Sequence, residues 1–262
     1  MKILVCLKQT PDTEATIKIT PDGKGIEEQN IKWVMSPYDE YAVEEAIRLK
    51  EKQGGETVVV SLGPDRVVES MRTALAMGMD RGVHCSDPAF AGSDALATAK
   101  VLAAVIKKEN PDLVLCGRQA IDFDQTQVPA FVAETLGLPQ VYMVAKLEVK
   151  DKKVVCNRRI EGGEEIVEAS LPAVLTCDKG LNEPRYASLP GIMKAKKKEV
   201  KKFGLADSGL GADQVGAGGA KLKVAGYLPL PDRPPGKVFK GEETADMVKK
   251  VVRLLRDEAK VI

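Results

Sequence analysis

The sequence lacks the residues on which most hydrolytic enzymes and metal sites depend. His84 is its only histidine, and a lone histidine without clustered cysteines or carboxylates is more often structural than a ligand. The five cysteines are odd in number, and none is paired at metal or redox spacing. They are Cys6, Cys85, Cys116, Cys156 and Cys177. No Gly-x-x-x-x-Gly-Lys-Ser/Thr loop and no nucleophile–base set is present either. We therefore expect no metal and no catalytic residue, and any chemistry belongs to a cofactor.

A strong net charge and a long apolar run are also missing. The 262 residues include 39 Lys and Arg against 38 Asp and Glu, a net charge of +1, so nucleic acid is not expected as a partner. No apolar run reaches the about 20 residues of a membrane span, and residues 1–7 read as a strand rather than a signal peptide. Four cysteines lie in apolar, strand-like runs, which is typical of free buried thiols in a reducing compartment. We expect a cytoplasmic protein without direct membrane insertion.

Strands and helices alternate along the first half of the sequence. Apolar runs predict buried strands at residues 2–8, 57–62, 82–85 and 112–116. Helices are predicted at residues 36–54, 94–108 and 125–136, and another after the turn at residues 63–65. Ser36 is the N-cap candidate of the first helix, with Asp39 completing a capping box, and residues 14–28 read as a small hairpin. The alternation predicts an α/β fold with an open parallel sheet flanked by helices.

The pattern changes after Pro139. Strands without intervening helices are predicted at residues 141–149, 152–159, 164–169 and 173–177. We interpret them as an antiparallel extension of one domain that spans residues 1–203. Residues 204–262 are then an extended, glycine- and proline-rich arm and a terminal amphipathic helix, although a flexible linker is the compositional default for the arm. The apolar side of that helix consists of Met247, Val248, Val251, Val252, Leu254 and Leu255.

The loop richest in ligand-binding groups follows the strand at residues 112–116. In an open parallel sheet, ligands bind beyond the carboxyl ends of the strands, where the strand order reverses. Gly117 lets the backbone approach a ligand closely, and Gln119 and Gln127 can hydrogen-bond a base or ribose. Thr126 and the N–H groups of the following helix can hold a phosphate. From the residues alone, Asp122 and Asp124 are better interpreted as ordinary helix-capping acids than as ligand-binding groups.

Residues 181–198, here called the recognition loop, place an apolar side chain on a polar and basic background. Leu189 directly precedes Pro190, and the residue before a proline is pushed toward an extended conformation. The flanking residues are too polar for a core strand, which favours a docking role for Leu189. The alternative is a hairpin loop whose leucine folds back onto its own core. The lysines that follow, among them Lys194 and Lys197, are either a solvated face or a steering patch for an acidic partner.

The recognition loop, LNEPRYASLP-x-IMKAKKK, resembles the signature of the beta subunit of electron transfer flavoproteins. Asn157-Arg158-Arg159-Ile160-Glu161-Gly162-Gly163 with residues 171–176 matches a second signature of that family, and residues 117–127 match its nucleotide loop. The resemblance extends in motif order over most of the chain. It implies an adenine nucleotide-binding fold like that of universal stress proteins, and an electron carrier rather than an enzyme with its own substrate.

The same resemblance implies two cofactors. FAD would lie at the interface with an alpha subunit, close to Tyr38, and either AMP or a second FAD would lie in a pocket of this chain. The pocket residues implied are Cys6, Ser36, Asp39, Leu62, Gly117, Gln119, Ala120, Asp122, Asp124, Gln125, Thr126 and Gln127. The short Asp-x-Asp-x-x-Gln-Val form of this loop is closer to flavin-bifurcating relatives, although Phe123 and Gln125 are not their usual residues.

The resemblance finally implies partners. Residues 204–262 would dock on the alpha subunit, acyl-CoA dehydrogenases of fatty acid beta-oxidation would donate electrons, and a quinone-reducing electron transfer flavoprotein oxidoreductase would accept them. Leu189 would insert into an apolar pocket of the dehydrogenase. Around it would lie Pro190, Ile192, Met193, Lys194 and Lys197. The alternatives are a bifurcating flavoprotein that oxidises NADH with a second FAD, and a stand-alone universal-stress-like protein that binds adenine nucleotide.

Overall fold

The computed structural model describes residues 1–231 and 235–262, which form two compact units, Met1–Gly226 and Tyr227–Ile262. The first unit is built on a nine-stranded sheet with the strand order β11-β5-β4-β1-β6-β10-β7-β8-β9. Its parallel part contains β1 (Lys2–Cys6), β4 (Glu56–Leu62), β5 (Arg81–Cys85), β6 (Leu113–Gly117), β10 (Ala173–Cys177) and β11 (Val200–Phe203). The predicted α/β class with a mostly parallel sheet is confirmed.

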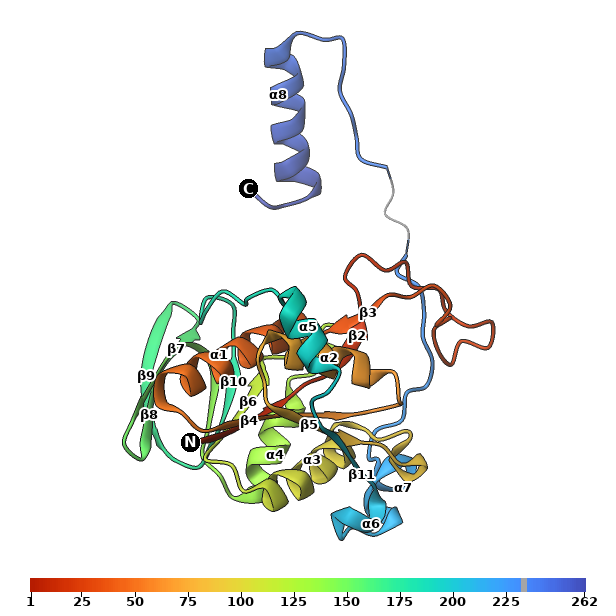
Figure 1. The fold of residues 1–262 in the computed structure, drawn as a ribbon. Coiled ribbons are helices and arrows are strands. Elements are labelled where there is room, and N and C mark those ends of the chain that lie inside the picture. The colour runs from red at the N-terminus through yellow and green to blue at the C-terminus, as the bar shows by residue number, and fades with distance from the viewer. Residues whose placement is uncertain (232–234) are drawn as a thin grey trace. The chain divides into compact units, whose positions relative to one another are not determined.

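Helices cover both faces of the sheet (Figure 1). They are α1 (Pro37–Gln53), α2 (Val67–Met77), α3 (Ala95–Glu109) and α4 (Gln127–Leu136). Alternate residues of β1 enter two separate cores, because side chains of a strand point to opposite faces in turn. Ile3 and Val5 join the core under α1 and α2, whereas Leu4 joins the core under α3 and α4. The continuous apolar runs of the sequence therefore reflect strands that are buried on both faces.

The extension of the sheet is antiparallel only in part. β7 (Gln140–Lys150), β8 (Lys153–Ile160) and β9 (Gly163–Ser170) form an antiparallel meander, as expected. β10 departs from the expectation, because it pairs parallel with both β6 and β7. All five of its residues are buried, which suits a central position in the sheet rather than the exposed edge at β9.

Three short helices follow β11, where the sequence predicts an extended arm. They are α6 (Leu205–Ser208), η2 (Ala212–Gln214) and α7 (Gly216–Gly219). The side chains of Leu205, Leu210 and Val215 pack against the core under α3 and α4, within the compact unit that continues to Gly226. No helix or strand occurs in residues 220–231 and 235–243. The second unit contains α8 (Thr244–Arg253) and the π-helical turn η3 (Leu254–Glu258).

Two small elements precede α1 and another follows β5. β2 (Gln9–Pro11) and β3 (Trp33–Met35) form an antiparallel pair, and between them the expected hairpin is reduced to one bridge, Ile19 with Ile26. η1 (Pro88–Phe90) leads into α3. The recognition loop contains a further helix, α5 (Leu189–Ala195). Among the described residues, no helix is long and apolar enough to span a membrane.

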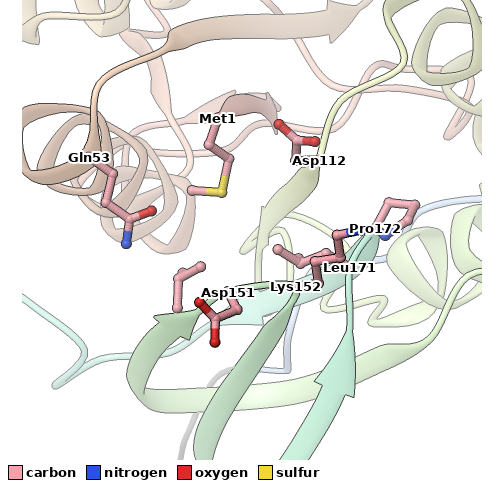
Figure 2. Close-up of a pocket in the computed structure, with 8 residues that line it drawn as sticks. Met1, Gln53, Asp112, Asp151, Lys152, Leu171 and Pro172 are labelled. Atoms are coloured by element: carbon pink, nitrogen blue, oxygen red, sulfur yellow. The ribbon is translucent and has the colours of Figure 1, made fainter.

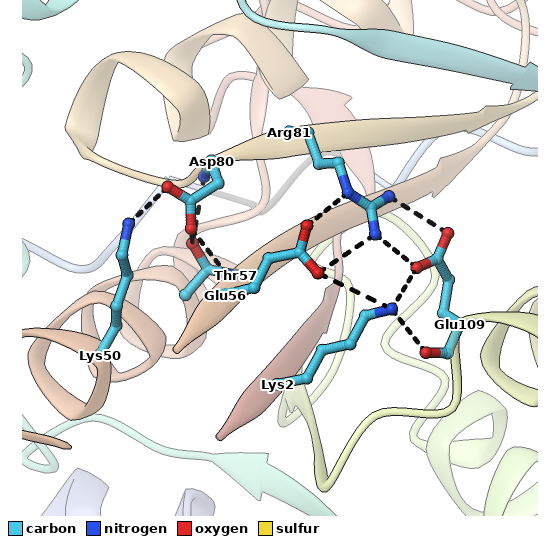
Figure 3. Close-up of polar contacts among 7 residues, drawn as sticks. All are labelled: Lys2, Lys50, Glu56, Thr57, Asp80, Arg81 and Glu109. Atoms are coloured by element: carbon cyan, nitrogen blue, oxygen red, sulfur yellow. Dashed lines mark hydrogen bonds and ion pairs between the residues drawn. The ribbon is translucent and has the colours of Figure 1, made fainter. Parts of the chain in front are cut away.

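Ion pairs fasten the amino edge of the sheet (Figure 3). Arg81 at the start of β5 contacts Glu56 at the start of β4 at 2.7 Å and Glu109 at the end of α3 at 2.6 Å. Lys2 at the start of β1 contacts Glu109 at 2.7 Å. The hydrogen bond from Arg81 is the main reason why the pKa of Glu109 falls to about 2. One carboxylate thus links two strands and a helix.

The histidine and the cysteines have the structural roles that the sequence suggests. His84 is fully buried, and its Nε2 lies 2.9 Å from the carbonyl oxygen of Gly63, to which it donates. All five cysteines are free and buried, which confirms the expectation of unpaired interior thiols. Burial raises the pKa of the thiols of Cys85 and Cys156 to about 12, so both are inert at neutral pH.

Candidate functional site

The strand order reverses at β1. From β1 the chain continues to β4 and β5 on one side, and then returns to place β6 on the other side of β1. The loops that follow β1 and β6 consequently diverge at the carboxyl edge of the sheet. This is where open α/β sheets bind their ligands. The crevice between these two loops is therefore the candidate site.

Asp39 joins the two loops at the base of this crevice. Its carboxylate accepts hydrogen bonds from the backbone N–H of Lys8 at 2.7 Å and of Gly117 at 2.9 Å. The predicted capping box is wrong, because the Ser36 side chain makes no capping hydrogen bond and Asp39 is engaged by the neighbouring strands. Burial is the main cause that raises the pKa of Asp39 to about 7, and the two N–H groups oppose that rise.

The packing of α1 requires a glycine at position 117. A Cβ at this position would lie 2.4 Å from Oδ1 of Asp39 and 2.7 Å from the carbonyl carbon of Tyr38. The absence of a side chain lets the first turn of α1 approach the end of β6. The backbone at Gly117 is therefore closely approached, and the group that approaches it in this chain is the first turn of α1.

The loop after β6 folds back onto the loop after β1. Lys8 forms an ion pair with Asp122 at 2.7 Å, and its ammonium lies 5.0 Å from the centre of the Phe123 ring. Within the loop, the amide of Gln119 donates to Asp124 at 2.8 Å. Asp122 and Asp124 thus have partners on the loop after β1 and on their own loop, and neither acts as the cap of α4.

A second polar group lies next to the crevice, and the sequence analysis missed it. The guanidinium of Arg118 lies 5.2 Å from the centre of the Tyr38 ring and 3.5 Å from the carboxylate of Asp178. The hydroxyl of Tyr142 donates to the carbonyl oxygen of Arg118 at 3.2 Å. Lys8 was missed as well. Arg118 directly follows β6 and Lys8 lies two residues past β1, and these positions at the carboxyl ends of buried strands are the signal that could have identified them.

Two sets of polar groups at this edge of the sheet are suited to hydrogen-bonding a ligand. The hydroxyl of Ser36 is fully buried and has no hydrogen-bond partner among the described residues. Thr126 makes no side-chain cap at the start of α4, so the first N–H groups of that ten-residue helix are available to a phosphate. Gln125 and Gln127 are exposed beside them. The hydroxyl of Ser36 and the first N–H groups of α4 are therefore the hydrogen-bonding groups that this edge of the sheet offers.

The predicted pocket residues form an inner and an outer group. The inner group consists of strand ends and the start of α1: Cys6, Ser36, Tyr38, Asp39, Leu62 and Gly117. The outer group lies on the loop after β6 and at the start of α4: Gln119, Ala120, Asp122, Asp124, Gln125, Thr126 and Gln127. The hydrogen bond from Gly117 to Asp39 lies within the inner group, and Lys8, which donates to Asp39 and pairs with Asp122, links the two groups.

A separate groove of about 450 Å³ lies at the opposite edge of the sheet (Figure 2). Met1, Asp112 and Leu171 line it, and they precede β1, β6 and β10. In a parallel sheet these positions mark the amino edge. The groove therefore does not belong to the candidate nucleotide site.

The recognition loop presents apolar side chains to solvent. Leu189 is 79% exposed and Met193 64%, and Pro190, Ile192, Lys194 and Lys197 are exposed as well. The predicted extended conformation of Leu189 is wrong, because this residue begins α5. Ser188 caps that helix by accepting from the N–H of Gly191 at 3.1 Å, and Pro190 is tolerated because first-turn N–H groups have no partner within a helix.

The mostly parallel sheet, with its switch point at β1, defines an open α/β protein. The family model described as "Electron transfer flavoprotein domain" matches residues 24–208. The chain is similar to the electron transfer flavoprotein subunit beta of Bacillus subtilis, with 41% identity over 263 residues and 100% of each chain covered. It is similar to the protein of the same name from Bos taurus, with 42% identity over 259 residues and 98% of each chain covered. With that of Thermoanaerobacterium thermosaccharolyticum it shares 42% identity over 242 residues, 92% of this chain and 93% of the relative. The chain therefore belongs to the electron transfer flavoprotein family, as a beta subunit.

Proposed function

We propose that this chain pairs with an alpha subunit and carries electrons from acyl-CoA dehydrogenases to a quinone-reducing partner. The redox chemistry is supplied by FAD bound at the interface of the two subunits, near Tyr38. This chain contributes the interface, the nucleotide crevice and the docking surface for the electron donor. The observation that carries the proposal is Leu189, an apolar side chain 79% exposed on a capped helix with lysines beside it.

The alpha subunit is proposed to bind the second unit and the segment that leads to it. Leu228 and Leu230 are about nine-tenths exposed, and Val248 on α8 is 54% exposed. α8 has no buried residue, although its apolar side chains share one side of the helix. Exposed apolar surface of this extent marks an interaction site.

The nucleotide of the crevice is proposed to be either AMP or the AMP half of a second FAD. The buried hydroxyl of Ser36 and the free N–H groups of α4 suit both, because both carry the same adenosine phosphate. The short loop of residues 118–126 favours the second FAD and with it a bifurcating flavoprotein that oxidises NADH. Counting flavins in the purified heterodimer decides between them, with one FAD per heterodimer for AMP and two for the bifurcating form.

Leu189→Ala tests the docking surface. We expect kcat/KM for electron transfer from the dehydrogenase to fall roughly tenfold or more, because a central apolar anchor contributes about 2 kcal/mol. The flavin content should not change. Ile166→Ala is the matched control, since Ile166 is 72% exposed on the distant strand β9. Equal rates for Leu189→Ala and the unaltered protein would refute the docking role.

A further inference from the structure

The recognition loop is held at both ends, while the side chains of Tyr186 and Leu189 between them are exposed. Arg185 lies on the amino-terminal side of Leu189, and Lys198 lies on the carboxyl-terminal side. Both make several hydrogen bonds to helices of the first unit. Between them, Tyr186 is 98% exposed and Leu189 is 79% exposed. The side chains of Tyr186 and Leu189 therefore do not anchor the loop, although Ala187 packs against the core under α1 and α2.

Arg185 fixes the amino-terminal end onto α1. Its Nε donates to Glu44 at 2.8 Å, and its Nη1 and Nη2 donate to Glu51 at 2.6 and 2.9 Å. The backbone N–H of Arg185 also donates to Glu44 at 3.1 Å. The fork geometry of a guanidinium allows one side chain to hold both carboxylates in a fixed orientation.

The carboxylate of Glu44 depends on this pairing. Its side chain is only 2% exposed, and a buried carboxylate is costly unless it is paired. Burial opposes its ionisation, but the hydrogen bonds from Arg185 and Arg48 outweigh burial and keep the pKa of Glu44 below its ordinary value. Beside it, buried Asn182 donates to the carbonyl oxygen of Tyr41 at 3.0 Å and to Glu45 at 2.9 Å.

The carboxyl-terminal end is fixed onto α2. Nη1 of Arg72 donates to the carbonyl oxygens of Ala195 and Lys198 at 2.5 and 2.6 Å. In return, Lys198 donates to the carbonyl oxygens of Leu75 at 2.9 Å and Met79 at 2.5 Å. A Cβ at Gly191 would lie 2.3 Å from the carbonyl oxygen of Ala76, so α5 rests directly on the end of α2.

A fixed tip lowers the entropy that docking must remove, because a loop already held in its bound conformation has less freedom to lose. We propose that Arg185 is a positioning residue for docking: through Glu44 and Glu51 it holds Leu189 in the orientation that the electron donor recognises. This inference rests on the proposed function, because it assumes that Leu189 meets the donor.

Arg185→Lys tests the inference in the complete heterodimer. Lysine keeps the positive charge but cannot bridge both carboxylates with a planar fork. We expect the KM for the heterodimer in the dehydrogenase reaction to rise about tenfold, with kcat and flavin content unchanged. Chymotrypsin cleavage after Tyr186 should accelerate in the same variant, because a loosened tip enters a protease more easily. Glu51→Gln, which leaves Glu44 paired, should give a smaller change of the same kind.

Combining the substitution with Leu189→Ala separates this inference from the proposed function. If Arg185 acts through Leu189, Arg185→Lys should raise KM in the unaltered background and have no further effect in the Leu189→Ala background. An unchanged KM and cleavage rate for Arg185→Lys, while Leu189→Ala still raises KM, would overturn the positioning role alone. A Leu189→Ala variant that transfers electrons normally would instead overturn the proposed docking surface. Full additivity of the two changes would also contradict the inference.

Discussion

The carboxylate of Asp39 accepts a hydrogen bond from the backbone N–H of Gly117 at 2.9 Å, across the point where the strand order of the sheet reverses. The two residues lie 78 positions apart in the sequence. Because Asp39 also binds the N–H of Lys8, one buried carboxylate holds both walls of the candidate crevice. The structure thus uses the first turn of α1 as a brace for the nucleotide loops.

The brace predicts a pH dependence of stability. The pKa of Asp39 is about 7 in the folded chain against 3.8 for the ordinary group, so between these values the folded state holds a proton that the unfolded state has lost. The contribution of Asp39 is complete below pH 3.8, declines as the pH rises, and is lost above about pH 7. Asp39→Asn should remove this slope, which approaches about 1.4 kcal/mol per pH unit. Urea unfolding of both proteins from pH 4 to 8 measures it, and parallel curves would contradict the prediction.

The ion-pair network at the amino edge of the sheet predicts a pH dependence of stability with the opposite sign. The pKa of Glu109 is lowered to about 2, chiefly by the hydrogen bond from Arg81, so its contribution is present above pH 4.5 and is lost as the pH falls through about 2. Glu109→Gln should lower the free energy of unfolding at pH 7 by about 1 kcal/mol, a value kept small because solvent screens the partly open pairs. Glu168→Gln, in an exposed pair, is the control and should change little. If the difference in unfolding free energy between Glu109→Gln and the unaltered protein stays constant down to pH 2, this account is wrong.

The apolar side of α8 predicts a test of subunit assembly. Val251→Glu places a charge among the side chains proposed to meet the alpha subunit, and should weaken association at least about tenfold. Lys249→Glu changes the charge on the same helix outside that apolar set, and should have little effect. Analytical ultracentrifugation of mixed subunits compares the two variants. Equal losses would mean that charge rather than apolar contact governs the assembly.

Elements with a long and regular pattern could be predicted from the sequence. The valine run of β4 and the spaced apolar residues of α1 indicate buried elements regardless of their neighbours. β2 and β3 could not be found in this way, because a strand of three residues has no measurable period. The short helices after β11 were missed for a related reason, since the few apolar residues that hold them are separated by glycines.

The candidate site was predictable in its position but not in its contacts. The ends of the predicted strands and the loop that begins at Gly117 locate the crevice, because open parallel sheets bind ligands at their carboxyl edge. Asp39 looked like a capping acid because its true partners, Lys8 and Gly117, are 31 and 78 residues away. Long-range hydrogen bonds of this kind leave no local signal. The recognition loop was read correctly as a segment that carries an exposed leucine, but its anchors on α1 and α2 became visible only in the fold.

The apolar side of α8 also bears on how the chain must be produced in a cell. Val248, Val251, Val252 and Leu255 remain open to water in the isolated subunit. A beta subunit synthesised in excess of the alpha subunit exposes this apolar surface to other unassembled copies, which promotes aggregation and degradation. Matched synthesis of the two subunits is consequently a condition for a good yield. Heterologous production of the beta subunit alone should give protein that aggregates.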